Sequence, residues 1–170
     1  MAAASRPMSL SFQTIDLVRH GDVCVAFRRD SYVCSFGSDQ AFFEGGGIDG
    51  YLEWLRAGIA RHPKGHVHVW NESSIVGQLE MRIRTNDPPT GYVNLFYLVP
   101  EARGTKAAGM LQKYAIEFMR AGGVHLAHLS VSPTNLRAMA YYQKHSWRDL
   151  GPRSDDTAVH LMEITISAES

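Results

Sequence analysis

The chain has 170 residues, of which 45% are hydrophobic, and its 17 basic and 17 acidic side chains leave a formal net charge of +0. This composition suits one globular domain with a substantial core and excludes a disordered chain. A neutral balance gives no support for nucleic acid or an anionic membrane as a partner, and the apolar runs are far shorter than the roughly 20 residues that cross a bilayer.

The N-terminal residues lack the charged segment and apolar run of a secretion signal. We expect a disordered tail over 1–10 and a single domain over 11–168. The two cysteines, Cys24 and Cys34, are too few for a disulfide scaffold, so reduced thiols are expected. A soluble cytoplasmic protein follows from these features.

Apolar spacing predicts one strand and two helices in the first third of the chain. Leu52, Leu55 and Ile59 share one face of the second helix, and Pro63 lies beyond its end. The expected elements are a strand over 12–18, a helix within 22–36 that ends near Gly37, a flexible break over 43–47, and a helix capped by Asp49.

The rest of the chain reads as three successive strands, a helix, a strand, a second helix and two closing strands. This order predicts an α/β or α+β domain built on a mixed sheet. The expected strands are 66–70, 74–83, 92–99, 124–132, 147–150 and 158–166, and the expected helices are 104–121 and a segment from 133 to about 145, with a loop over 85–91 and a polar turn over 153–156.

The segment Val-Pro-Glu-Ala-Arg-Gly-Thr-Lys-Ala-Ala-Gly-Met-Leu over 99–111 is the most informative stretch. It joins an apolar strand to an apolar-periodic helix through small residues. Such a turn exposes backbone N–H groups at a helix N-terminus, where they hold phosphate. The segment therefore predicts a site for a phosphate-bearing cofactor.

A second informative segment, over 131–144, follows the first along the chain. Together the two segments resemble the GNAT superfamily of N-acetyltransferases. In the family's cofactor loop, Arg/Gln-x-x-Gly-x-Gly/Ala, Arg103 takes the first place, Ala108 the last, and Lys106 stands where the central glycine is expected. The second segment, over 131–144, is similar to the family's strand-loop-helix, although Ser146-Trp147 replaces the usual Gly-Phe ending.

This resemblance implies a GNAT-like fold, with a central mixed, mostly antiparallel sheet flanked by helices, and acetyl-CoA as the cofactor. A neutral primary amine would attack the thioester directly in a ternary complex, and a backbone N–H near Leu98 would donate to the thioester carbonyl. The residues that the resemblance assigns to coenzyme A are Tyr97, Leu98, Val99, Arg103, Gly104, Thr105, Lys106, Ala107, Ala108, Gly109 and Asn135.

Lys106 is the departure that bears on cofactor binding. Glycine is used where the backbone approaches a ligand closely or adopts a positive φ. A lysine here either adds a positive charge beside a phosphate or crowds the loop and weakens binding.

The resemblance assigns Tyr142 to protonation of the departing thiolate. The proton acceptor is open, because the family's glutamate on the strand before the second helix is replaced here by Ser130. Glu80, on a strand expected to border the acceptor cleft, is one candidate base. His128, on the same strand face as Ser130, is another, and bulk water is a third.

His66 and His68 share one strand face and His62 is nearby, but the chain offers no Cys-x-x-Cys and no carboxylate third ligand beside them, so no metal site is expected. The acceptor is open among a small metabolite, an antibiotic, a protein N-terminus and a lysine side chain, and so is assembly as a homodimer. The alternative function is a catalytically weak module of the same fold that binds acyl-CoA as a sensor or partner. A third reading, a protein that keeps only the fold, requires a blocked cofactor loop.

Overall fold

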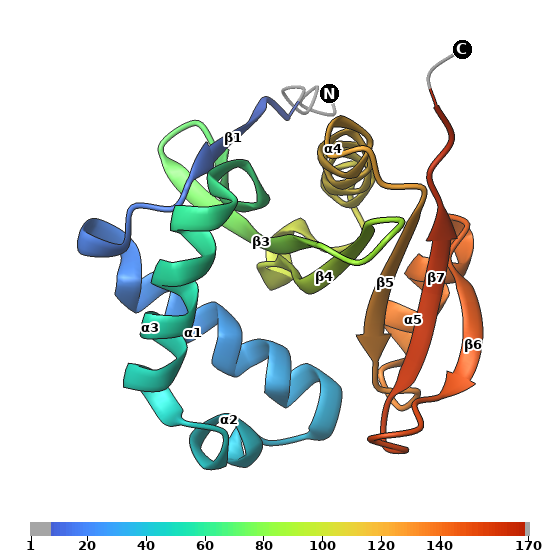
Figure 1. The fold of residues 1–170 in the computed structure, drawn as a ribbon. Coiled ribbons are helices and arrows are strands. Elements are labelled where there is room, and N and C mark those ends of the chain that lie inside the picture. The colour runs from blue at the N-terminus through green and yellow to red at the C-terminus, as the bar shows by residue number, and fades with distance from the viewer. Residues whose placement is uncertain (1–7, 169–170) are drawn as a thin grey trace, which may run out of the picture.

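The computed structural model describes residues 8–168, which form one seven-stranded sheet in the order β1-β2-β3-β4-β5-β7-β6 (Figure 1). Neighbouring strands are antiparallel except for β4 and β5, which are parallel. The expected mixed, mostly antiparallel sheet is therefore confirmed. The elements in chain order are β1 (Leu10–Thr14), α1 (Leu17–Phe36), α2 (Gln40–Glu44), α3 (Gly47–Arg61), β2 (His66–Asn71), β3 (Ser74–Arg84), β4 (Thr90–Leu98), α4 (Ala107–Ala121), β5 (Leu126–Val131), α5 (Leu136–Lys144), β6 (Arg148–Pro152) and β7 (His160–Thr165).

The main core lies between the sheet and α4. Leu111, Ala115 and Met119 of α4 pack with Leu79 and Met81 of β3, all at most 1% exposed. These strand residues alternate with side chains that point to the opposite face of the sheet. One face of β2 and β3 therefore supplies the apolar core that helix α4 covers.

The opposite face of β2 and β3 is polar and equally buried. His66, His68, Gln78 and Glu80 are at most 1% exposed, and α1 and α3 lie over this face of the sheet (Figure 1). Buried polar groups must be hydrogen-bonded to one another or to the covering helices, because their desolvation is otherwise uncompensated. This face therefore holds a polar network instead of a second apolar core.

The N-terminal bounds differ from those expected. Strand β1 spans Leu10–Thr14, and α1 begins at Leu17 because the Asp16 carboxylate accepts the Arg19 N–H and caps the helix. The predicted tail is thus too long, since Leu10 already pairs with Asn71. Residues 1–7 of that tail lie outside the described residues.

A short helix, α2, occupies Gln40–Glu44, where only a break over 43–47 was expected. Phe42 is buried in a small cluster with Tyr51 and Leu55, which explains why this segment is ordered. Helix α3 begins at Gly47, so Asp49 lies in its first turn and is not its cap.

Helix α4 starts at Ala107, three residues later than expected, because the Thr105 hydroxyl accepts the Ala107 N–H and holds the preceding residues out of the helix. The remaining elements lie within three residues of their expected bounds; the largest difference is at α5, which begins at Leu136 and not at 133. Within residues 8–168, no helix is both long and apolar enough to cross a membrane.

Candidate functional site

Strands β4 and β5 pair along only part of their length. Thr90–Val93 run beside Leu126–Leu129, but farther along the chain β4 pairs only with β3 and β5 only with β7. The register also shifts at Asn94, because Glu80 faces Leu95 while Met81 faces Val93. This β-bulge stands where the two strands separate, so the sheet opens into a wedge.

The loop from Arg103 to the first turn of α4 lies at the end of this wedge. Gly104 has a positive φ of 71°, which glycine adopts without strain. Hydrogen bonds inside the described part of the chain leave five backbone N–H groups of this segment without an acceptor. These belong to Gly104, Thr105, Lys106, Ala108 and Gly109.

Lys106 does not need the freedom of a glycine. Its φ of −63° and ψ of −16° are right-handed helical, a conformation open to any residue. Its side chain is exposed and lines the cavity described next. The backbone gives no reason for this lysine to distort the loop.

A cavity of about 1390 Å³ occupies the wedge and extends to both faces of the sheet. On the face of α4 and α5 it is lined by the loop and by residues of α5. On the other face it is lined by α1, by α2 and by the turn between β6 and β7. The cavity thus has two ends, which we call the loop end and the α1 end.

The cavity is positively charged although the chain as a whole is neutral. Its lining includes Arg103, Lys106, Arg137 and Lys144 at the loop end and Arg28 and Arg153 at the α1 end, with Asp156 as the one carboxylate among the described lining residues. Arg103 is held by Asp30, whose carboxylate lies 3.0 Å from its Nη2. Free backbone N–H groups beside Lys and Arg side chains form a fitting site for a polyphosphate.

Tyr141 and Tyr142 reach the cavity from α5 and differ in their bonding. The Tyr141 hydroxyl donates to the Ala108 carbonyl at 2.6 Å and so ties α5 to the start of α4. The Tyr142 hydroxyl has no hydrogen-bond partner among the described residues. Burial raises the pKa of the Tyr142 phenol above its ordinary value, so the hydroxyl keeps its proton at neutral pH and can donate it.

The sequence pattern of the Acetyltransferase (GNAT) family matches residues 29–147, which include the wedge, the loop and α5. The chain belongs to the GNAT acetyltransferase family. The family confirms the expected class of enzyme, with acetyl-CoA as the acetyl donor. Among curated proteins, no sequence match was found.

Solved acetyltransferase structures share the fold. PaiA N-acetyltransferase from Thermoplasma acidophilum with coenzyme A has a TM-score of 0.75 and 19% identity, over 93% of this chain and 99% of that one. Spermidine N-acetyltransferase from Vibrio cholerae with CoA and spermine has a TM-score of 0.70 and 13% identity, over 92% of this chain and 95% of that one. RimL, a ribosomal L7/L12 alpha-N-protein acetyltransferase with coenzyme A, has a TM-score of 0.70 and 15% identity, over 96% of this chain and 98% of that one. At these identities the likeness shows the fold alone.

In this GNAT acetyltransferase, the residues expected to bind the cofactor lie mostly on the cavity wall. All of them line it except Val99, whose N–H donates to the Val76 carbonyl of β3, and Ala107, which is buried in the core. Asn135 caps α5, since its Oδ1 accepts the Ala138 N–H at 3.2 Å. Its amide nitrogen keeps its hydrogens for another partner.

The backbone N–H of Leu98 points away from β3. Val99 donates to β3, and consecutive residues of a strand direct their N–H and C=O groups to opposite edges. The Leu98 carbonyl, on that open edge, accepts Arg103 Nε at 2.9 Å. This geometry fits the expected donor to a thioester carbonyl.

Asp30 is a residue of the site that the sequence analysis missed. Its carboxylate accepts the Tyr97 hydroxyl at 2.6 Å and Arg103 Nη2 at 3.0 Å, and so fastens α1 to β4 and to the loop. Burial and the Asp30 carboxylate raise the pKa of Tyr97. No signal in the sequence pairs residues this far apart, because the contact exists only once α1 has packed on the sheet.

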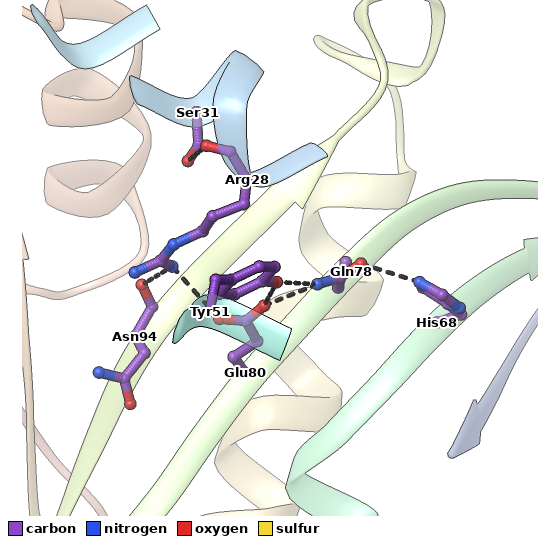
Figure 2. A network of polar contacts seen from close by, with 7 residues as sticks. All are labelled: Arg28, Ser31, Tyr51, His68, Gln78, Glu80 and Asn94. Carbon is purple, nitrogen blue, oxygen red and sulfur yellow. Dashed lines mark hydrogen bonds and ion pairs between the residues drawn. The ribbon is translucent and has the colours of Figure 1, made fainter. Parts of the chain in front are cut away.

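Glu80 lies in a buried network and not on the cavity wall. Figure 2 shows its carboxylate between Arg28, Tyr51 and Gln78. Arg28 Nη1 lies 3.2 Å from Oε1 and donates also to the Asn94 carbonyl at 2.9 Å, while Gln78 Nε2 and the Tyr51 hydroxyl donate to Oε2. The interpretation of Glu80 as a strand residue bordering the cleft is therefore corrected: α1 and α3 cover it.

The network continues from Gln78 to His68 and Cys24. His68 Nε2 lies 2.8 Å from Gln78 Oε1 and 3.5 Å from Cys24 Sγ. Burial lowers the pKa of His68 to about 4 and raises that of Cys24 to about 12, so both are neutral near pH 7. Burial and the neighbouring Glu80 carboxylate raise the pKa of Tyr51. The network holds one ion pair, Arg28 with Glu80.

His128 does not line the cavity either, although it shares a strand face with Ser130. Its Nε2 lies 2.9 Å from Glu163 Oε2 on β7. Ser130, two residues farther along β5, does line the cavity, where its hydroxyl lies 2.7 Å from the Tyr92 hydroxyl and accepts Arg153 Nη1 at 3.0 Å. The polar residue of β5 that meets the cavity is thus Ser130, whose hydroxyl pairs with that of Tyr92 on β4.

Proposed function

We propose that this GNAT acetyltransferase transfers the acetyl group of acetyl-CoA to a primary amine by direct attack in a ternary complex. One observation supports the proposal: the cavity passes through the wedge and is lined by the loop from Arg103 to Gly109 at one end and by Tyr32 and Phe36 of α1 at the other. Two substrates can therefore meet inside it from opposite faces of the sheet.

The loop end fits the cofactor. The free N–H groups of the loop, with Lys106, Arg137 and Lys144, would hold the pyrophosphate and the remaining phosphate. Acetyl-CoA supplies an activated acetyl thioester. The Leu98 N–H would donate to its carbonyl oxygen, and the Tyr142 hydroxyl would protonate the sulfur that leaves.

The proton of the attacking amine goes to water in this proposal. Glu80 reaches the cavity only through Arg28, whose guanidinium does not lose a proton in proteins, so the network cannot relay one. His128 is occupied by Glu163. We assign Glu80 a positioning role: it holds Arg28 on the carbonyl of the bulge residue Asn94.

We keep a cytoplasmic location in this proposal because both cysteines of the chain, Cys24 and Cys34, are free.

Two measurements on the purified protein test the proposal. Acetyl-CoA at about 100 times its Kd should stabilise the protein by about 2.7 kcal/mol, which raises the Tm by about 5–10 °C. Acetyl-CoA with a panel of primary amines should release free thiol and yield N-acetyl products. Binding without transfer to any amine would favour the alternative, an acyl-CoA-binding module, and absence of binding would refute both.

A further inference from the structure

The α1 end of the cavity has an apolar side. Tyr32 and Phe36 lie one helical turn apart on α1 with ring centroids 6.0 Å apart, and Ala41 of α2 adjoins them. The ring of Phe42 packs against that of Tyr32, with the two centroids 5.9 Å apart. Phe36 is 48% exposed, so part of its ring can still be covered by a ligand. An uncharged substituent can pack against this side.

Both arginines at the same end are already paired. Arg28 is bound to Glu80, and Arg153 binds Asp155 through two hydrogen bonds. Asp156 is the remaining carboxylate among the described lining residues, beside Arg153 in the same turn. With both arginines paired, Asp156 is the one carboxylate that the described lining of the α1 end leaves to an ammonium group.

An aromatic cage exists beside this end, but the protein itself fills it. The Arg28 Cζ lies 5.7 Å from the ring centroids of Tyr32 and of Tyr51, and 5.9 Å from that of Trp54. Rings in this arrangement bind ligand ammonium groups in other proteins. Here an additional ammonium on the acceptor would meet a guanidinium instead of an empty cage.

Helix α1 spans the wedge on this face. Asp30 ties it to Tyr97 and Arg103 on the β4 side, and the Ser35 carbonyl accepts the Thr134 hydroxyl at 3.1 Å on the β5 side. This connection narrows the approach to the reaction centre. A small amine passes it more readily than a segment of a folded protein.

From these observations we propose that the acceptor is a small monoamine with an uncharged aromatic substituent, and not a polyamine. The inference rests on the proposed function and adds the substrate class. The substituent would pack on Tyr32 and Phe36 while the amine reaches the wedge at the bulge. A polyamine would lose this packing, and its second ammonium group would find the aromatic cage already filled by Arg28.

The test compares kcat/KM for 2-phenylethylamine, n-butylamine and spermidine at saturating acetyl-CoA, with products identified by mass spectrometry. We expect 2-phenylethylamine to exceed spermidine by at least about tenfold, since spermidine lacks the ring that packs on Tyr32 and Phe36 and finds the aromatic cage filled by Arg28. Transfer to spermidine at an equal or higher kcat/KM would overturn the substrate class and leave the proposed function intact. Transfer to none of the amines would overturn both.

Phe36→Ala tests whether the Tyr32–Phe36 surface produces the preference for an aromatic amine. It should lower kcat/KM about fivefold to tenfold for 2-phenylethylamine and less than twofold for n-butylamine. Phe43→Ala is the matched control, because Phe43 is 47% exposed but does not line the cavity. Equal losses for both amines in Phe36→Ala, or a loss of aromatic preference in Phe43→Ala, would contradict the proposed packing.

Discussion

Glu80→Gln tests whether the buried carboxylate positions the bulge or accepts a proton. The side chain is 0% exposed, and all its partners, Arg28, Tyr51 and Gln78, are donors. A glutamine keeps the size but replaces one acceptor oxygen with an amide that is itself a donor. At least one donor then faces another donor, and Arg28 loses its counter-charge.

The structure sets the size of the effect. Removing one partner of a buried ion pair costs about 3–5 kcal/mol, and the lower end applies because the Arg28 side chain keeps 18% exposure. At about 2–4 °C per kcal/mol for a chain of this size, the Tm should fall by roughly 6–12 °C. Asp39→Asn is the control: its pair with Arg29 is solvent-exposed, so the expected loss is under about 1 kcal/mol.

The assay combines thermal unfolding with pH–rate profiles at subsaturating amine. A positioning role predicts a lower Tm and a lower rate at every pH, with the shape of the profile unchanged. A profile that loses its rising limb, together with an unchanged Tm, would refute this reasoning and restore Glu80 as the base.

Three further predictions concern the loop end, α5 and the buried histidine. Tyr142→Phe should lower kcat about 10²-fold with little change in acetyl-CoA affinity. Tyr141→Phe loses only the hydrogen bond to Ala108 and should leave kcat nearly unchanged. The reverse pattern would assign the general acid to Tyr141. Lys106→Gly should weaken acetyl-CoA binding severalfold at low salt and less at high salt, measured by titration calorimetry, because the helical backbone at Lys106 gains nothing from glycine; tighter binding would mean that the lysine crowds the loop. Burial lowers the pKa of His68 to about 4 in the native state, whereas in the unfolded chain it is about 6.5. As the pH falls below 6.5, the unfolded chain therefore binds a proton that the native state does not. The free energy of unfolding should fall by about 3 kcal/mol between pH 6.5 and pH 4. His68→Gln should remove this part of the acid dependence in denaturant melts, and an unchanged dependence would place its origin elsewhere.

Local pattern was enough to predict most of the fold. Alternating residues such as Val67 and Leu79 predict strands, and the apolar stripe of Leu111 and Ala115 predicts α4, because each pattern depends on a period within one element. The order of the elements and the loop from Arg103 to Gly109 then indicate the family. Element ends were less accurate, since hydrogen bonds made by Asp16 and Thr105 decide where α1 and α4 begin.

The arrangement of the site was decided by tertiary structure. The alternating pattern of a strand places the side chains of Glu80 and His128 on one of the two faces of the sheet. It does not show which elements cover that face. Packing of α1 and α3 buries Glu80 beside Arg28, and the pairing of β5 with β7 turns His128 toward Glu163. Asp30 and the Ser35–Thr134 bond likewise join residues far apart in the chain. Sequence periodicity encodes the apolar surface of each element, whereas long-range polar contacts arise only when the elements have packed, and these contacts decide which side chains meet the cavity.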